Sequence, residues 1–433
     1  MVTVMSRTLS LSYLEALKNK RLAAFLSGDL VSRIGDGMTL VALPVLVLGL
    51  PSEVPAAVRL SLVYAVPLAA PLIVSLFFGL GTKRFDPAVT VAADSALRII
   101  FYGLAAGLAL GGTLTFGWLL ALLSAGSVLR SLGAGARRLF ALGLAGPEGS
   151  YAVNGMIGLS LGAGMFVFGP ACGGLLLLSG SAAPALLANA GTYVALLAAV
   201  LVVRHSSAQP GPRPEDPPAA VSGWSILRSK PRILRLFAVL FLYDLFYAPV
   251  EIAMPLLMLH DLDQPSTALG TIWACYGFGA LAGAVAVNYL RRFPPAPVLV
   301  AVIAGWALCV AALGLSGTGA AAFAAFAAAG FVYAPFNPLV FVVLQGQLAD
   351  HEQQPVFTLW TAGLTAALPL GLALGGPLVS MVGSRQSLFL SAAVSLGLAL
   401  AALAILRHEL WPASSRPRSR RKRSAVPAAG KNG

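Results

Sequence analysis

Long apolar stretches alternate along the whole chain with short segments rich in Gly, Pro, Arg and Lys. A helix needs about 20 mostly apolar residues to cross the hydrocarbon core of a bilayer. Stretches of that kind predict twelve membrane spans, at residues 22–49, 56–80, 88–110, 114–136, 152–178, 183–203, 233–259, 267–290, 296–316, 319–345, 356–382 and 385–406. The pattern therefore predicts an all-α integral membrane protein that crosses the bilayer many times.

The composition supports a membrane protein over a soluble one. Hydrophobic residues make up 58% of the chain and charged residues only 10%, against about 25% charged residues in an average soluble domain. A soluble fold must cover its exterior with polar groups, and this chain has too few of them. The three cysteines fall within apolar spans, which gives neither a disulfide framework nor metal-ligand spacing. We therefore expect no metal site.

One long polar stretch divides the chain. Residues 204–232 are rich in Pro, Ser and mixed charges, the composition of a flexible linker. On this basis we expect an N-terminal six-helix bundle over 22–203 and a C-terminal one over 233–408. A short segment, 1–21, precedes the first bundle, and a basic tail, 409–433, follows the second.

The net charge of +13 is distributed in a way that predicts orientation. If the N-terminus is cytoplasmic, most Lys and Arg residues fall on the cytoplasmic side, as the positive-inside rule requires. They include Arg7, Lys18, Lys20, Arg21, Lys83, Arg84, Arg137, Arg138, Arg291, Arg292 and those of the linker and tail. We therefore expect both termini and the linker in the cytoplasm. The charge orients the protein in the bilayer, and we expect no nucleic-acid partner.

The two predicted bundles resemble one another in sequence. Three short matches recur in the same order at nearly constant spacing: ALPVLV at 42–47 with AMPLLM at 253–258, KRF at 83–85 with RRF at 291–293, and GP at 169–170 with GP at 376–377. Together they indicate a parallel duplication of a six-helix unit.

Several stretches resemble the major facilitator superfamily, and in particular its bacterial branch of enterobactin exporters and macrolide or multidrug efflux pumps. They are RLAAFLSGDLVSRIGDGMTLVALPVLVL at 21–48, GLGTKRFD at 79–86, GPACGG at 169–174, LFYAPVEIAMPLLM at 245–258 and FVYAPFNPLVFVVLQ at 331–345. The resemblance extends from about residue 20 to about residue 408. It implies two bundles that rock around a substrate site at the bilayer midplane.

The resemblance also implies a set of gating and coupling residues. Gly79, Lys83 and Arg84 match the superfamily's loop motif, although Lys83 stands where that motif has an acid. Gly169 and Pro170 match its span-five antiporter motif. Arg130 matches the arginine of the proton-linked span-four motif, which is one residue shorter here.

Three charges lie within the first predicted span. Asp29 and Arg33 are four residues apart, and Arg33 and Asp36 are three apart, so all three share one helix face. Arg33 can neutralise only one of the two acids. We predict Asp36 as a proton-coupling or substrate-sensing acid, with Arg130 or Arg33 as its counter-charge. The alternative, which fits Asp29 best, is a static network that orients the helix.

Two further spans carry charges. Asp94 and Arg98 repeat the spacing of four, and we predict that they belong to the cytoplasmic gate. Asp244 and Glu251 are seven residues apart in span seven, so they share a face with Tyr247 between them.

Two acids around an aromatic ring suit a cationic or amphiphilic ligand. We therefore assign Asp244, Tyr247 and Glu251 to the substrate cavity, although solvation of Glu251 and bonding of Asp244 to a neighbouring helix remain alternatives. We add Asn337, which stands between Phe336 and Pro338 and is predicted to break span ten.

The chain contains no P-loop, and none of its four histidines falls mid-span. We therefore predict a transporter and not an enzyme, driven by a proton gradient without a cofactor. The predicted function is efflux of a small amphiphilic molecule by alternating access, from a monomer in the bacterial cytoplasmic membrane. The alternatives are a facilitator or symporter for a lipid or nutrient, and a membrane sensor or scaffold that no longer transports.

Overall fold

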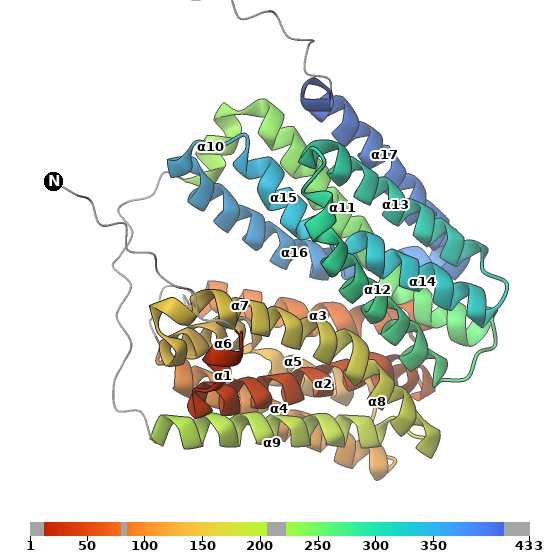
Figure 1. Cartoon of the computed structure of the whole chain (residues 1–433). Helices are drawn as coiled ribbons and strands as arrows, with labels where there is room; N and C mark the ends of the chain where they lie inside the picture. Colours follow the sequence, from red (N-terminus) through yellow and green to blue (C-terminus); the bar gives the residue numbers. More distant parts are fainter. Residues whose placement is uncertain (1–12, 79–84, 206–221, 411–433) are drawn as a thin grey trace, which may run out of the picture.

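The computed structural model describes residues 13–78, 85–205 and 222–410, which form two groups of helices (Figure 1). The N-terminal half consists of α1 (Tyr13–Leu17), α2 (Lys20–Gly49), α3 (Ala56–Phe78), α4 (Pro87–Leu110), α5 (Phe116–Ser127), α6 (Arg130–Ala145), α7 (Ser150–Leu159), the π-helical η3 (Ser160–Phe168), α8 (Gly169–Leu176) and α9 (Ala183–His205), with the short turns η2 (Pro147–Gly149) and η4 (Leu177–Ser179).

The C-terminal half is built from the remaining helices. They are α10 (Gly223–Ser229), α11 (Pro231–Leu256), η5 (Leu257–Asp261), α12 (Ala268–Leu290), α13 (Pro295–Leu315), α14 (Gly319–Tyr333), α15 (Phe336–Gln345), α16 (Asp350–Val382) and α17 (Ser384–Leu410). Twelve spans long and apolar enough to cross a bilayer occur among the described residues. The prediction of an all-α membrane protein with twelve spans in two bundles is confirmed.

Local capping fixes where the first helices start. The side-chain oxygen of Asn19 accepts hydrogen bonds from the N–H groups of Arg21 and Leu22, at 3.1 and 3.3 Å, directly before α2. Asp86 caps α4 in the same way, and Pro87 then occupies the first helical position, where no N–H partner is needed. These caps satisfy backbone donors that would otherwise lack a partner.

Two predicted elements differ from the structure. The apolar pattern predicts span four over 114–136, but its helices run to Ala145 and end where Gly146 takes a φ of 71°. Span ten does break, but between Tyr333 and Phe336, so Asn337 lies in the first turn of α15 and not at the break. The predicted break at Asn337 is therefore wrong by a few residues.

The two halves lie close together at one end and apart at the other (Figure 1). We call the end where α9 stops and α10 begins the linker end, and the opposite end the hairpin end. The Ser61 hydroxyl of α3 donates a 2.7 Å hydrogen bond to the Leu372 carbonyl of α16, joining the halves toward the hairpin end. There, a Cβ on Gly174 of α8 would lie 3.2 Å from the Cα of Gly270 of α12.

The outer surface is apolar. Large hydrophobic side chains point outward on both halves, among them Phe77, Leu178, Phe278 and Met381. In water such a surface would aggregate, but in a bilayer it contacts lipid tails. The protein is a multi-pass membrane protein.

Close helix contact in the C-terminal half depends on glycine. A Cβ at Gly279 of α12 would overlap the carbonyl oxygen of Ala327 in α14, and one at Gly283 would overlap that of Phe331. Glycines four residues apart are the pattern that lets membrane helices pack backbone to backbone.

We therefore expect Gly279→Ala to destabilise the protein by about 1–3 kcal/mol, because the added methyl group forces α12 and α14 apart. The matched control is Gly107→Ala in α4, where an added Cβ would meet no atom within 4 Å. Thermal unfolding of the purified protein should show a lower midpoint for the first variant only. Equal midpoints would contradict the assigned contact.

Candidate functional site

Arg137 of α6 lies at the centre of a buried charge cluster in the N-terminal half. Its guanidinium donates to Asp29 of α2 at 3.1 Å, to the Ser32 hydroxyl at 3.1 Å and to Asp94 of α4 at 3.3 Å. Ser160, the first residue of η3, donates to the other oxygen of Asp29 at 3.0 Å. One arginine thus ties together two acids from different helices, and both acids are only 1% exposed.

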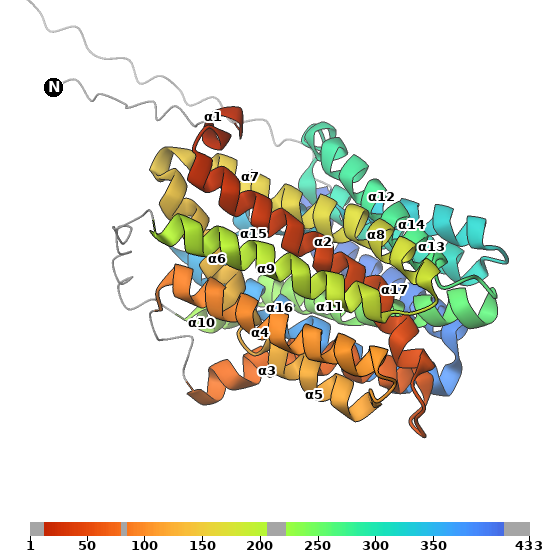
Figure 2. The ribbon, with the colours of Figure 1, turned by 90° about the horizontal axis from the view of Figure 1, so that it is seen from below.

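Arg98 continues the cluster toward the middle of the bundle. It donates to Asp94 at 3.1 Å and to the hydroxyl of Tyr193 at 2.8 Å. Tyr193, from α9, in turn donates to Asp36 at 2.8 Å. Arg98 also lies 3.6 Å from Asp36 and 4.9 Å from the centre of the Tyr193 ring. Figure 2 shows how α9 lies between α2 and α4, where Tyr193 can bridge them.

The counter-charges differ in part from those predicted. Arg33 lies 3.7 Å from Asp29, but no ion pair between Arg33 and Asp36 occurs among the described residues. Arg130, the other predicted partner, forms no ion pair in that part of the chain, although its charge acts on Asp36 together with that of Arg98. The predicted pairing of Asp36 is therefore corrected to Arg98 and Tyr193.

The local ion pair of α4 has the geometry that its spacing predicts. Asp94 and Arg98 are bonded at 3.1 Å and nearly inaccessible to solvent. Gly133 of α6 packs directly against Asp94, and a Cβ there would come within 2.7 Å of the carboxyl carbon. The shortened span-four motif therefore supplies close contact with Asp94.

Arg137 and Tyr193 are the residues that sequence reasoning missed. The sequence pattern places Arg137 in a cytoplasmic loop, because Arg137 and Arg138 together are typical of the end of a span. A signal against that interpretation did exist, since the Gly146–Pro147 pair is a common helix stop and lies nine residues further on. A single tyrosine in an apolar span carries no such signal.

The acids of the C-terminal half have a different environment. Asp244 of α11 accepts a 3.4 Å hydrogen bond from the Tyr333 hydroxyl, while its second carboxylate oxygen is buried without a partner. Glu251 lies four residues after Tyr247 on α11, so the two share one face of the helix. Neither acid forms an ion pair within the described ranges.

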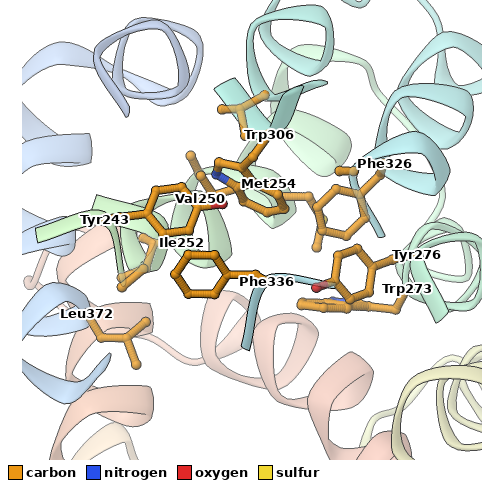
Figure 3. Close-up of a cluster of buried hydrophobic side chains, with 14 of the residues drawn as sticks. Tyr243, Val250, Ile252, Met254, Trp273, Tyr276, Trp306, Phe326, Phe336 and Leu372 are labelled. Atoms are coloured by element: carbon orange, nitrogen blue, oxygen red, sulfur yellow. The ribbon is translucent and has the colours of Figure 1, made fainter. Parts of the chain in front are cut away.

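An aromatic cluster covers these acids. The Tyr247 ring stacks on Trp306 with centroids 4.8 Å apart, and Tyr333 lies 5.3 Å from Trp306. Phe336 completes the group, 5.5 Å from Tyr333 and 4.7 Å from Tyr243. Trp306, Phe336 and Tyr243 are seen together in Figure 3, with rings from several helices meeting in one layer.

Several polar atoms on these helices have no hydrogen-bond partner. They are the second oxygen of Asp244, the Tyr243 hydroxyl, the Trp306 ring nitrogen and the Asn337 side-chain oxygen. A buried polar group without a partner costs about 1–3 kcal/mol. Four of them in one region indicate a place where a proton, water or a ligand is accommodated.

The remaining predicted residues fall in two groups. Gly79, Lys83 and Arg84 lie outside the described residues. Gly169 and Pro170 are buried at the start of α8, where a Cβ on Gly169 would lie 2.6 Å from the Cα of Gly37 in α2. The antiporter-like motif therefore supplies a close contact between α2 and α8. In the described part of the chain, no group of three or more His, Cys, Asp or Glu residues could hold a metal.

The comparisons with known proteins agree with this architecture. The family model of the Major Facilitator Superfamily matches residues 236–431. The multidrug efflux pump Tap of Mycobacterium tuberculosis is 26% identical over 383 residues, which cover 83% of this chain and 87% of the pump. Over its C-terminal half, the chain is therefore similar to the major facilitator superfamily. The pump of Mycobacterium bovis matches equally well, which confirms the expected resemblance to the efflux branch.

Solved transporter structures share the fold of this protein. A bacterial homologue of the iron transporter ferroportin, in its inward-facing state, aligns with a TM-score of 0.70 at 15% identity, covering 89% of this chain and 98% of that one. The nucleoside transporter NupG aligns with a TM-score of 0.66 at 15% identity, over 89% and 99% of the two chains. At these identities the likeness shows a shared fold.

Loss of the central arginine tests the charge cluster. We expect Arg137→Gln to destabilise the transporter by about 3–5 kcal/mol, because Asp29 loses its closest cation while it stays buried. Arg138→Gln is the matched control, since Arg138 is the adjacent residue and is exposed. Thermal unfolding should distinguish the two variants, and adding Asp29→Asn to Arg137→Gln should recover part of the loss. Equal effects of the two arginine variants would contradict the central role of Arg137.

Proposed function

We propose that this transporter exports a small amphiphilic molecule in exchange for protons, and that the substrate and the proton compete for Asp244 and Glu251. The observation that carries the proposal is the buried oxygen of Asp244, which has no partner and no cation nearby among the described residues. A charge at the centre of a membrane helix costs about 2.5–3.5 kcal/mol. Such a carboxylate is stabilised by taking up a proton or by holding a cationic group.

The aromatic cluster fits the same kind of substrate. Tyr247, Trp306 and Tyr333 offer ring faces beside the two acids. A cation over an aromatic face gains about 0.5–2 kcal/mol, more as water is removed. An amphiphile with a basic group satisfies the acids with its charge and the rings with its apolar part.

Relatives and the distribution of charge support the proposed direction and location. The mycobacterial relatives are multidrug efflux pumps by name, which favours export and a bacterial plasma membrane. With the basic linker end in the cytoplasm, the end at which the two halves lie apart in Figure 1 faces inward. An exporter loads its substrate from that side. The proton gradient is then the energy source, and the monomer needs no cofactor.

Asp36 has two roles open to it. It is bonded to Tyr193 and Arg98, and its side chain is 11% exposed, more than those of Asp29 and Asp94. It either exchanges protons through the Tyr193 hydroxyl or anchors α2 to α4 and α9. The bonded arginine favours the anchoring role, and the proposal therefore places proton exchange at Asp244 and Glu251.

Removal of the unpaired acid tests the proposal. In proteoliposomes with a pH gradient, the wild-type protein should move ethidium against its gradient, and a protonophore should abolish this movement. We expect Asp244→Asn to reduce proton-driven transport at least about tenfold, equivalent to about 1.4 kcal/mol, because the amide can neither exchange a proton nor pair with a cation. Transport rates at equal protein density give the comparison.

Two further variants make the result specific. Asp263→Asn removes an exposed loop acid whose φ of 48° asparagine tolerates, and it should transport like the wild type. Asp36→Asn should retain proton dependence if Asp36 anchors helices. Unchanged proton-driven transport by Asp244→Asn would overturn the assignment, and accumulation of ethidium along with protons would replace export by symport.

A further inference from the structure

A row of threonines follows one face of α16 in its linker-end half. Thr358, Thr361 and Thr365 are spaced by three and four residues, which places them in line on a helix. We call these three residues the α16 stripe. All three are exposed although they lie within a predicted span. Lipid tails gain nothing from contact with a threonine hydroxyl. The polar character of this helix face therefore indicates a role other than contact with lipid.

Two open pockets in the described part of the chain lie along this stripe. One, of about 440 Å³, is lined by Thr358 and Thr361 together with Phe357 and residues at the start of α16. The other, of about 630 Å³, is lined by all three threonines and by Leu72 of α3. The two share Thr358 and Thr361, and Leu72 belongs to the other half, so the second lies between the two halves. Each volume is in the range of small-molecule sites.

The stripe offers hydrogen-bond acceptors only. Thr358 donates its hydroxyl proton to the carbonyl of Gln354 at 2.9 Å, and Thr361 donates to that of Phe357 at 3.0 Å. Thr365 donates to the carbonyl of Thr361 at 2.8 Å. A hydroxyl has one proton and two lone pairs, so each oxygen still accepts a hydrogen bond from the cavity. The groups that fit are N–H or O–H donors.

The rest of the lining suits the same chemistry. Asp350 stands at the linker end of the first cavity, where its carboxylate accepts from Gln353 at 3.2 Å. Of the residues that the structure describes, no Lys or Arg lines either cavity. Leu72, Ala362 and Ala366 supply an apolar wall. The site therefore suits an amphiphile whose polar end carries N–H donors and whose other end is apolar.

The stripe also leads toward the acids of the proposed substrate site. A Cβ on Gly363 would lie 3.6 to 3.8 Å from the rings of Phe237 and Phe241 of α11, and one on Gly371 would meet the backbone of Leu245. Thr365 lies between these two contacts, so it is about one helical turn from the level of Asp244 on α11. A molecule that enters at the linker end passes the threonines before it reaches Asp244.

We propose that the α16 stripe is a vestibule binding site that selects amphiphiles bearing N–H donors before they reach Asp244. The site rests on the proposed export function and refines its substrate class. It contributes affinity through hydrogen bonds, whereas the acids contribute charge. The two contributions can therefore be measured separately with two cationic probes, one that carries N–H donors and one that carries none.

The test compares binding of ethidium and tetraphenylphosphonium to the purified full-length protein. Ethidium carries N–H donors, and tetraphenylphosphonium carries the same charge without any. We expect the triple variant Thr358→Val, Thr361→Val, Thr365→Val to bind ethidium about five- to tenfold more weakly, because valine keeps the shape and removes the acceptors. Its affinity for tetraphenylphosphonium should stay unchanged or increase. Fluorescence and equilibrium dialysis give the two dissociation constants.

Two controls isolate the hydroxyl groups. The triple Thr→Ser variant at the same positions restores the acceptors and should bind ethidium like the wild type. Thr271→Val replaces an exposed threonine of α12 outside both cavities and should also have no effect. If the triple Thr→Val variant bound both cations equally more weakly, or bound both like the wild type, the binding site on the α16 stripe would be overturned. The export proposal would not be affected by either result. Failure of the wild type to bind either cation would overturn both.

Discussion

The cost of placing charge inside a bilayer governs the N-terminal half. Each unpaired charge at mid-membrane costs about 2.5–3.5 kcal/mol, and this half contains three acids and three arginines in one cluster. Arg137 and Arg98 join α2, α4, α6 and α9 through Asp29, Asp94, Asp36 and the Tyr193 hydroxyl. Because every acid in the cluster has an arginine within 4 Å, these four helices are fixed relative to one another. Moving any one of them would expose a buried charge, so this half is suited to move as a rigid body.

The C-terminal half resembles the first in sequence, but among the described residues its acids have no arginine partners. Asp244 and Glu251 have aromatic neighbours in place of arginines, and polar atoms nearby are left without partners. Such a group of side chains is unfavourable when empty and ionised, and it becomes favourable when a proton or a cationic ligand arrives. In the N-terminal half every acid of the cluster is paired, whereas under the proposed function the acids of the C-terminal half are satisfied by the proton or ligand that they bind. That division gives alternating access a rigid part and a responsive part.

Sequence reasoning found the features that depend on local spacing. Twelve spans follow from the length of apolar runs, and the ion pairs Asp94–Arg98 and Asp29–Arg33 follow from a separation of four residues. Partners on other helices could not be predicted, because one sequence does not show which helix faces meet. Tyr193 and Tyr333 are of this kind. Arg137 escapes prediction for another reason: two adjacent arginines are typical of the end of a span, whereas this helix continues to Ala145 and buries the first of them.

The longest of the described helices, α16, extends from the linker end to the hairpin end. It spans 33 residues, about 50 Å at 1.5 Å per residue. Near its hairpin end Leu372 accepts the hydrogen bond from Ser61 of the opposite half, and near its linker end the α16 stripe lines the cavity beside Leu72. Ser61 and Leu72 belong to the same helix, α3. In the proposed transport cycle, a rotation of α16 against α3 that breaks the Ser61 contact would also change the space beside Leu72. Because one pair of helices carries both contacts, the proposed cycle would couple opening at one end to closing at the other, and a ligand bound to the stripe would be displaced in that movement.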